Sequence, residues 1–437
     1  MSAVVSNPVT PRKSPPAFRG KFSIGIEGTL EPISGKNTLR VSGHYAAQRW
    51  DEDFRLVRSL GLDEVRYPIP WHDVERQPGR YHWRHLDKIM ASACDTHRLD
   101  LIADPLHHTS YPRWLKRGFL DSRFEDHYVA FVAAFTARYP AIKRFTPFNE
   151  PTCTLDFCGA RGFWHPHAKG DDTYVAMLRH TARATARVIH AIRALRPSAF
   201  ILHVDTFQRH TALDRASRAR AEFLNHRRFL FEELICGKID RSHPLHTYLR
   251  HHGFPADDLK WHRDHAVTLD ERGGNYYPLN EEQLRAGETH HAPSQDPVGL
   301  AALVREYAQR VSCPLSLTET NIQGTARDRI SWLKYILGDC ETLQADGLRL
   351  RRFAWYPLFD CAGWNSLLQG KRWKRDPQGV LSCGNRWERT SNEFSEIYRQ
   401  VVHGLPSAEI PAYAFTAAHD ARLGPLKRLM RWNWMEQ

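Results

Sequence analysis

Lys143-Arg144-Phe145-Thr146-Pro147-Phe148-Asn149-Glu150-Pro151 and Pro314-Leu315-Ser316-Leu317-Thr318-Glu319-Thr320-Asn321 are the two stretches that decide the fold. Each is a short run of β type that ends on a glutamate, so each carboxylate is expected at the C-terminal end of a strand. Several further strand and helix patterns separate the two stretches. Strand-end carboxylates so far apart along the chain converge only if their strands close into a barrel or are neighbours in one sheet.

The rest of the chain repeats this pattern. From Phe22 onward, short apolar runs alternate with helical segments, which is the rhythm of βαβ units in a parallel sheet. The predicted strands are Phe22–Ile26, Glu64–Tyr67, Leu99–Asp104, Lys143–Phe148, Phe200–Asp205, Ala266–Leu269, Pro314–Thr318 and Phe353–Leu358. The sixth strand is the least well defined, because residues 270–280 either extend it or form its loop. The predicted helices are Trp50–Leu60, Arg84–His97, Ser122–Tyr139, Asp172–Leu195, Arg215–Cys236, Pro297–Val311, Arg327–Leu343 and Asn392–His403.

Eight strands, each followed by a helix, predict an α/β fold with a single (β/α)₈ TIM barrel and long βα loops. The length of 437 residues allows such a barrel as one domain. Residues 1–20 are rich in Pro, Ser and Val without periodicity and are expected to be a disordered tail. The catalytic barrel is expected over residues 21–405. Residues 406–437, with Leu, Met and Trp between basic residues, are expected to be a C-terminal extension packed on the barrel rather than a membrane-surface helix.

Composition and charge are those of an ordinary globular protein and argue against a nucleic-acid partner. Hydrophobic residues make up 42% and charged residues 25%, as in ordinary globular domains. The net charge of +12 could attract nucleic acid, anionic lipid or an acidic saccharide. Arginines are spread through helical stretches and form no long basic block, which favours a solvated basic surface and no nucleic-acid partner. The 13 Trp, 15 Tyr and 21 Phe suit either a carbohydrate cleft or an aromatic core.

Cysteine and histidine positions give no sign of a disulfide scaffold or a metal site. The eight cysteines lack paired spacing, and the adjacent pairs His107-His108 and His251-His252 point their side chains in different directions. The first twenty residues contain no apolar segment of signal-peptide length, and no stretch is long enough to span a bilayer. We therefore expect no metal, no cofactor, no integral membrane segment and a cytoplasmic location.

Two carboxylates at the C-terminal rim of a barrel are suited to hydrolysing a glycosidic bond. In a retaining mechanism one carboxylate attacks the anomeric carbon while the other protonates the leaving oxygen and then activates water. Glu150 fits the acid/base role, because Phe148 and Pro151 are expected to desolvate its carboxyl and raise its pKa. Glu319 must stay ionised to act as the nucleophile.

Several motifs occur in the order found in one known family. They are Phe148-Asn149-Glu150-Pro151, Thr318-Glu319-Thr320-Asn321, Leu106 to Pro112, Asn275-Tyr276-Tyr277 and Trp355 to Trp364. Together they resemble the family 1 β-glycosidases, which belong to the clan of barrel glycosidases with catalytic Glu on strands four and seven. The resemblance covers about Phe22 to Val402. Thr320 departs from it, because the family usually has Asn directly after the nucleophile.

This resemblance implies roles for individual residues. Glu150 would be the acid/base and Glu319 the nucleophile, held ionised by Arg66 and the Tyr277 hydroxyl. The remaining implied contacts are with a small saccharide or glycoside. They are Asn149 to the 2-hydroxyl, His108 (rather than its neighbour His107) to another hydroxyl, and Trp355 as the floor of the subsite. The mechanism needs no cofactor.

The pattern breaks on one side of the sugar. The family reads the outer hydroxyls with a Gln on strand one and a Glu after strand eight, whereas this chain aligns Gly25 and Gly363 there. A glucose-type ring would lose charge-assisted hydrogen bonds worth about 1.5–3 kcal/mol each. Glu27 is expected to replace one lost contact, and Trp364 is a further candidate for substrate binding. We therefore expect a sugar other than plain glucose or galactose, such as a pentose or a deoxy or substituted sugar.

Four alternatives remain. A member of the same clan that acts on oligosaccharides would keep the same catalytic pair. A non-catalytic carbohydrate-binding or sensing barrel would keep the fold, although the presence of both glutamates favours an enzyme. A nucleic-acid-binding protein driven by charge has no motif to support it. A metal-dependent hydrolase is disfavoured by the histidine spacing.

Overall fold

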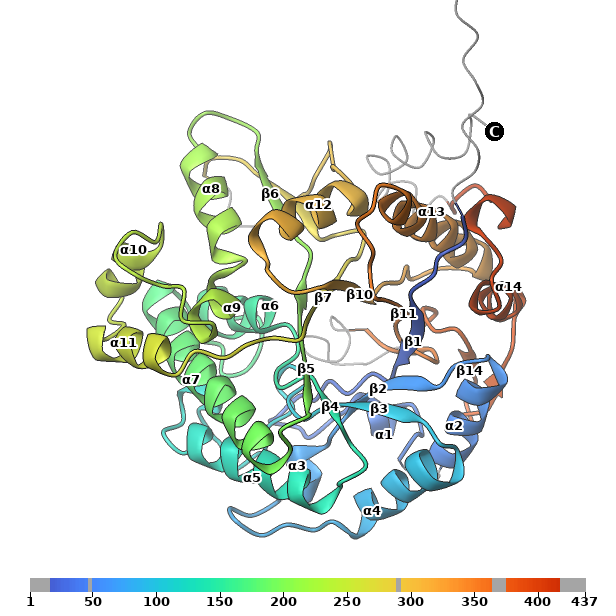
Figure 1. Ribbon diagram of the computed structural model, residues 1–437, viewed down its shortest axis with the longest axis horizontal. Helices are drawn as coiled ribbons and strands as arrows, with labels where there is room; N and C mark the ends of the chain where they lie inside the picture. The colour runs from blue at the N-terminus through green and yellow to red at the C-terminus, as the bar shows by residue number, and fades with distance from the viewer. Residues whose placement is uncertain (1–15, 46–48, 288–291, 364–374, 417–437) are drawn as a thin grey trace, which may run out of the picture.

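The computed structural model describes residues 16–45, 49–287, 292–363 and 375–416. Eight parallel strands form a closed barrel in the order β1-β11-β10-β7-β5-β4-β3-β2, and helices surround it (Figure 1). This confirms the predicted (β/α)₈ TIM barrel. The barrel strands are β1 (Lys21–Gly25), β2 (Glu64–Pro68), β3 (Asp100–Asp104), β4 (Arg144–Phe145), β5 (Phe200–Thr206), β7 (Glu271–Asn275), β10 (Leu315–Glu319) and β11 (Arg352–Trp355).

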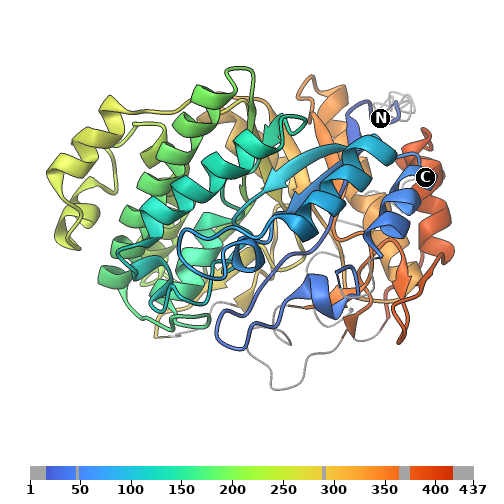
Figure 2. The same cartoon turned by 90° about the horizontal axis from the view of Figure 1, so that it is seen from below.

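The helices follow the strands along the chain and form the outer layer. They are α1 (Thr38–Val41), α2 (Trp50–Ser59), α3 (Trp71–Val74), α4 (Arg84–Met90), α5 (Phe124–Arg138), α6 (Pro151–Leu155), α7 (Asp171–Leu195), α8 (Arg218–Arg227), α9 (Leu230–Ile235), α10 (His246–His251), α11 (Ala256–Asp264), α12 (Leu300–Arg310), α13 (Ala326–Ala345) and α14 (Glu393–Val402). In Figure 2 the yellow segment with α10 and α11 lies at the side of the molecule opposite α14. No helix of the described residues is both long enough and apolar enough to cross a membrane.

Short strands outside the barrel belong to the loops on its C-terminal side. One three-stranded sheet joins β6 (Arg209–Ala212), β8 (Glu281–Leu284) and β9 (Ala292–Pro293). Two hairpins follow β11. They pair β12 (Cys361–Ala362) with β13 (Arg375–Asp376), and β14 (Ser382–Cys383) with β15 (Arg389–Thr390). The long βα loops expected from the sequence therefore carry secondary structure of their own.

The sixth barrel strand was predicted in the wrong place. It is β7, Glu271–Asn275, and not Ala266–Leu269. A Cβ on Gly273 would come within 2.4 Å of Thr318, and a Cβ on Gly274 within 2.0 Å of Phe207. Close packing therefore requires two glycines in a central strand, a composition that otherwise indicates a loop.

One predicted helix and one predicted tail also differ from the structure. The segment Arg215–Cys236 forms two helices, α8 and α9. Phe18, which we expected in a disordered tail, is only 8% exposed and packs edge-on against the rings of Phe22 and Phe353. Apolar burial orders this part of the segment, while residues 1–15 lie outside the described residues.

The C-terminal segment contacts α13. The Ser407 hydroxyl donates to Glu341, and the Tyr413 N–H donates to the Ser331 hydroxyl at 2.9 Å. These contacts involve the first part of the predicted extension, and residues 417–437 lie outside the described residues.

Polar layers alternate with an apolar one inside the barrel. At the N-terminal end, Arg352 of β11 bridges Glu64 of β2 and Glu271 of β7. Above it lie the apolar side chains Ile102, Leu202 and Val204. A second polar layer lies at the C-terminal end, where the strands open into the loops. The polar groups at the C-terminal end face the loops, where barrels of this kind carry their functional sites.

Candidate active site

A cavity of about 590 Å³ opens at the C-terminal end of the barrel. Both glutamates singled out from the sequence line it, together with Glu27 and Tyr277. The strands that carry Glu150 and Glu319 lie on the same barrel but are not neighbours. Barrel closure therefore brings the two carboxylates together, as the strand-end pattern predicted.

Glu150 lies in a sharp turn between β4 and α6. Its backbone is left-handed (φ 48°, ψ 55°), its N–H donates to the Val204 carbonyl at 3.0 Å, and Pro151 begins α6. Such a backbone is strained for a residue other than glycine and is typical of functional positions. This turn places Glu150 at the barrel mouth, where it lines the cavity.

The Glu150 carboxyl is in an environment that favours its protonated form. The side chain is fully buried, and its Oε1 accepts a hydrogen bond from Asn275 Nδ2 at 2.8 Å. Oε2 has no hydrogen-bond partner within the described residues. Burial, helped by the negative charge of Asp205, raises the pKa of Glu150 to about 7. A group of this kind can hold a proton near neutral pH and donate it from Oε2.

Glu319 reaches the cavity through an irregularity in β10. Ser316 donates to Glu271 and Thr318 donates to Asn275, so both side chains face the barrel interior. Regular alternation would turn Glu319 outward. The register between β10 and β7 shifts between Leu317 and Glu319, and a shift of this kind redirects a side chain at a barrel rim.

Two groups donate hydrogen bonds to the Glu319 carboxylate, one to each oxygen. Arg66 Nη2 donates to Oε1, and the Tyr277 hydroxyl donates to Oε2 at 2.5 Å. Arg66 is 4% exposed and also donates to Asp104 and Asn149 at 2.9 and 2.8 Å. A buried cation and a hydroxyl donor both stabilise the ionised carboxylate. The contrast with the environment of Glu150 separates the two glutamates chemically.

Asn275 joins the two sides of this pair. It donates to Glu150 through Nδ2 and accepts from Thr318 through Oδ1. Its partner in the β10 register is Glu319. The sequence motif Asn275-Tyr276-Tyr277 pointed to this strand end, although only Tyr277 was assigned a role.

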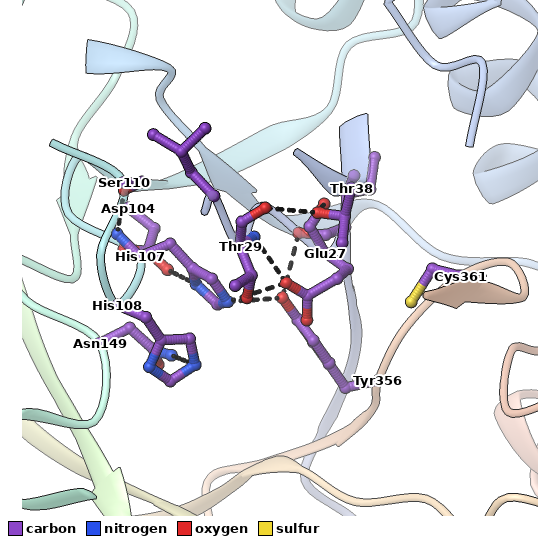
Figure 3. A network of polar contacts seen from close by, with 12 residues as sticks. Glu27, Thr29, Thr38, Asp104, His107, His108, Ser110, Asn149, Tyr356 and Cys361 are labelled. Atoms are coloured by element: carbon purple, nitrogen blue, oxygen red, sulfur yellow. Dashed lines mark hydrogen bonds and ion pairs between the residues drawn. The ribbon is translucent and has the colours of Figure 1, made fainter. Parts of the chain in front are cut away.

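Glu27 and His107 form a second charged pair, at the end of β1 (Figure 3). Glu27 Oε1 lies 3.4 Å from His107 Nε2, and His107 Nδ1 lies 2.7 Å from Asp104 Oδ2. Burial opposes charge in both groups, but the opposite charges prevail. They lower the pKa of Glu27 to about 2 and raise that of His107 to about 9. The sequence interpretation preferred His108 and did not assign His107 a role.

His108 lies behind the cavity wall, and Asn149 lies between it and Arg66, directly before Glu150 in the chain. His108 is 1% exposed, its Nδ1 lies 2.8 Å from the Thr154 hydroxyl, and its Nε2 lies 3.3 Å from Asn149 Nδ2. Burial and the charge of His107 lower the pKa of His108 well below its usual range. The prediction that His108 contacts the sugar is wrong in this geometry, because protein groups engage both ring nitrogens. His108 instead orients Asn149 beside Glu150.

The aromatic side chain at the end of β11 is not the one expected. Trp355 is fully buried, donates to the Gln378 carbonyl at 2.9 Å and packs against Phe394 of α14 at 4.4 Å between ring centroids. The prediction that Trp355 floors the cavity is therefore wrong, because its indole faces the outer helix. Tyr356 lines the cavity instead. Trp364 lies outside the described residues.

Other side chains fill the positions of the two missing sugar contacts. A Cβ on Gly25 would come within 2.0 Å of the Tyr356 ring, and a Cβ on Gly363 within 2.3 Å of Asp376 Oδ2. Tyr356 and Asp376 both line the cavity. At Gly25 and Gly363, where the family has sugar-binding side chains, the side chains of Tyr356 and Asp376 fill the space.

The opposite side of the cavity has an apolar wall and paired charges. Its two arginines are paired with carboxylates: Arg161 with Asp156 at 2.5 Å and Glu282 at 3.6 Å, and Arg227 with Asp156 and with Asp171 at 3.9 Å. The aromatic and aliphatic side chains there are those of Phe157, Phe163, Trp164, Leu224 and Leu279. This wall lines the same cavity as Glu150. Within the described ranges, no cluster of three or more His, Cys, Asp or Glu side chains could hold a metal ion.

Comparisons with known proteins agree with this fold. The glycoside hydrolase family 42 model, described as Beta-galactosidase, matches residues 42–129. A β-galactosidase of Thermus thermophilus is 33% identical over 73 residues, which are 16% of this chain and 11% of that protein. The chain thus matches about a tenth of the length of this curated relative.

Solved structures match over nearly the whole barrel. A family 1 β-glucosidase from Thermotoga maritima has a TM-score of 0.73 at 16% identity, covering 89% of this chain and all (100%) of that one. The β-glucosidase from the same organism in complex with deoxynojirimycin has a TM-score of 0.74 at 16% identity and covers 89% and 99%. These likenesses show a common fold. With the partial family 42 match, they agree with the resemblance to barrel glycosidases that the sequence motifs indicated.

Proposed function

We propose that this chain is a retaining β-glycosidase that cleaves a glycosidic bond by double displacement. The observation that carries the proposal is the contrast between two glutamates on one cavity. Glu150 is fully buried near the negative charge of Asp205, and its pKa is raised to about 7. Glu319 lies between a buried arginine and a tyrosine hydroxyl. Carboxyl groups with opposed environments are the equipment for acid/base and nucleophilic roles.

In the first step, Glu319 attacks the anomeric carbon while Glu150 protonates the leaving oxygen through Oε2. In the second step, the ionised Glu150 takes a proton from water, which attacks the glycosyl-enzyme and releases Glu319. Arg66 and Tyr277 hold Glu319 ionised between turnovers. Asn275 keeps Glu150 in place as its charge changes, because its amide donates to either form of the carboxyl.

Asn149 is proposed to bond the sugar 2-hydroxyl. Its Oδ1 accepts from Arg66 and its Nδ2 shares one N–H with His108. A second N–H of the same amide serves the sugar, where a hydrogen bond to the 2-hydroxyl strengthens in the transition state. The apolar wall of Phe157, Phe163 and Trp164 is proposed to contact the leaving group.

The glycone is proposed to be a sugar other than plain glucose or galactose. The Tyr356 ring closes the space beside Gly25, and Asp376 occupies the space beside Gly363. A pentose, a deoxy sugar or a substituted sugar suits this altered wall.

The eight cysteines are free thiols, which favours a reducing, cytoplasmic location.

A turnover screen tests the proposal. The purified protein is assayed against aryl β-glycosides of hexoses, pentoses, deoxy sugars and uronic acids, with Glu319→Gln alongside. We expect hydrolysis of at least one glycoside, no turnover by the variant, and retention of configuration by NMR of the first product. Inverted product would exclude double displacement, and equal rates for wild type and Glu319→Gln would exclude this nucleophile.

A carbohydrate-binding barrel without catalysis is the second candidate, because two expected sugar contacts have been replaced. It predicts that a sugar binds without turnover and that Glu319→Gln leaves function unchanged. A glucoside or galactoside turned over as fast as every other sugar would instead refute the proposed glycone.

A further inference from the structure

One continuous network joins Glu27 to the proposed nucleophile, and Figure 3 shows its first part, from Glu27 through His107 to Asp104. Glu27 pairs with His107, and His107 pairs with Asp104. Asp104 in turn accepts from Arg66 at 2.9 Å, and Arg66 donates to Glu319. Glu27 therefore belongs to the same buried electrostatic unit as the reacting carboxylate, although β1 and β10 are not adjacent strands.

The network carries an excess of negative charge. Its anions are the carboxylates of Glu27, Asp104 and Glu319, and its cations are Arg66 and the protonated His107. With all five groups ionised, the sum is one negative charge. His107 has its pKa raised to about 9 and Glu27 has its pKa lowered to about 2, so both stay charged over the physiological range. Each of the five groups is at most 7% exposed, so solvent screens the excess poorly.

Glu27 offers one carboxylate oxygen to the cavity. Oε1 is held by the Thr29 N–H at 2.6 Å and by His107. Oε2 accepts no hydrogen bond from any group in the part of the chain that the structure describes, and Glu27 lines the cavity. The Glu27 residue is only 7% exposed. An ionised carboxylate oxygen that faces a cavity and has no partner among the described residues can accept hydrogen bonds from a ligand.

The backbone around Glu27 is held rigidly. Its carbonyl accepts from the Thr38 hydroxyl at 2.8 Å, and the preceding carbonyl, of Ile26, accepts from the Tyr356 hydroxyl at 3.2 Å. Tyr356 also stacks on the His107 ring at 6.0 Å between centroids. The carboxylate is therefore pre-organised, and little ordering is required when a ligand binds.

We propose that Glu27 determines the charge class of the substrate, accepting hydrogen bonds from hydroxyl groups of an uncharged glycone and excluding sugars that carry a carboxylate. This inference rests on the proposed glycosidase function and names its substrate class. A sugar hydroxyl donates to the open Oε2, a charge-assisted hydrogen bond. An acidic sugar in the same place brings a second anion against a network that already has excess negative charge.

The net charge of +12 does not contradict this assignment. In the part of the chain that the structure describes, the arginines that line the cavity are Arg161 and Arg227, and their partners are Asp156, Glu282 and Asp171. Among the described residues, the positive charges that line the cavity are therefore paired with carboxylates. The sugar subsite is anionic in a protein that is basic.

The test compares neutral and acidic glycosides with a charge-removing variant. Wild type, Glu27→Gln and Glu31→Gln are assayed against aryl β-hexosides, pentosides and deoxyhexosides, and against the β-glucuronide and β-galacturonide. Glu31 is the matched control, because its carboxylate bonds only the N–H groups of Ile33 and Ser34 and does not line the cavity. Thermal unfolding checks that each variant is folded.

We expect wild type to prefer its best neutral glycoside over both uronides by at least about 100-fold in kcat/KM. Glu27→Gln should lower kcat/KM for that neutral glycoside by about 10- to 100-fold, the size of a lost charge-assisted hydrogen bond. Glu27→Gln should also lower the ratio of kcat/KM for the neutral glycoside to kcat/KM for the uronides. Removing the Glu27 charge weakens the repulsion between the network and the carboxylate of an acidic sugar. Glu31→Gln should change neither quantity.

Two results would overturn the assignment while leaving the glycosidase intact. They are a uronide turned over as fast as the best neutral glycoside, or unchanged kcat/KM in Glu27→Gln. Binding of the same glycosides by saturation-transfer NMR separates the remaining cases. Selective binding of neutral sugars without turnover, lost in Glu27→Gln, would refute the proposed function and support the role of Glu27. Failure of wild type to bind any neutral glycoside would refute both.

Discussion

Replacing Glu150 by Gln should make the protein more stable at pH 8 than the wild type. The wild-type carboxyl has its pKa raised from 4.5 to about 7 by burial. Below pH 4.5 the folded and unfolded states are both protonated. As the pH rises from 4.5 to 7, the unfolded state loses the proton while the folded state keeps it. The native state binds more protons there, so its stability falls as the pH rises.

The difference between the two pKa values corresponds to about 3 kcal/mol. This loss is complete above pH 7 in the wild type. It is absent in Glu150→Gln, whose amide resembles the protonated carboxyl and still accepts from Asn275. For a chain of 437 residues, about 3 kcal/mol corresponds to a Tm difference of about 3 °C.

Calorimetric unfolding of both proteins from pH 4 to pH 8 measures the effect. The Tm difference between variant and wild type should increase with pH and level off above about pH 7. Glu31→Gln is the control with the reversed sign, because hydrogen bonds to Ser34 and Ile33 hold the pKa of Glu31 below its usual value despite the opposing effect of burial. A constant Tm difference between Glu150→Gln and wild type would show that Glu150 ionises normally, and the acid role would lose its basis.

Two further substitutions test the surroundings of the site. Asp205→Asn removes a negative charge that raises the pKa of Glu150, so the alkaline limb of the pH profile of kcat/KM should move to lower pH. An equal loss of activity at every pH would indicate that Asp205 has only a structural role, through its hydrogen bond with Thr152. Gly25→Ala should cost about 1–3 kcal/mol of stability through collision with the Tyr356 ring, measured by denaturant unfolding. Gly338→Ala, whose Cβ would have no neighbour nearer than 3.4 Å, should cost nothing, and a cost as large as that of Gly25→Ala would refute the packing argument.

Most barrel strands could be located from local pattern. Seven of the eight predicted strands overlap barrel strands, because short apolar runs bounded by turn residues carry their own signal. Glu271–Asn275 was missed because Gly273 and Gly274 are explained only by Thr318 and Phe207, which lie on other segments. A local sequence pattern of a few residues contains no information about close packing against distant segments.

The site could be predicted in part. Glu150 and Glu319 were found from their strand-end contexts, and Arg66 and Tyr277 from the resemblance. Trp355 was misassigned because a strand-end aromatic can face the cavity or the outer helix, and only the backbone direction decides between them. Asn275, His107, Asp104 and Tyr356 have roles that depend on partners far away in sequence.

The sequence by itself determined which residues lie at strand ends, and hence the two carboxylates and the barrel that unites them. Strand periodicity and turn residues are properties of short segments, so they can be recognised from the local sequence. The tertiary structure alone decided how those carboxylates differ. Burial of Glu150, the register shift before Glu319 and the charged network from Glu27 arise where distant strands meet. A pKa is set by everything within a few ångströms of a group, and barrel closure determines what lies there.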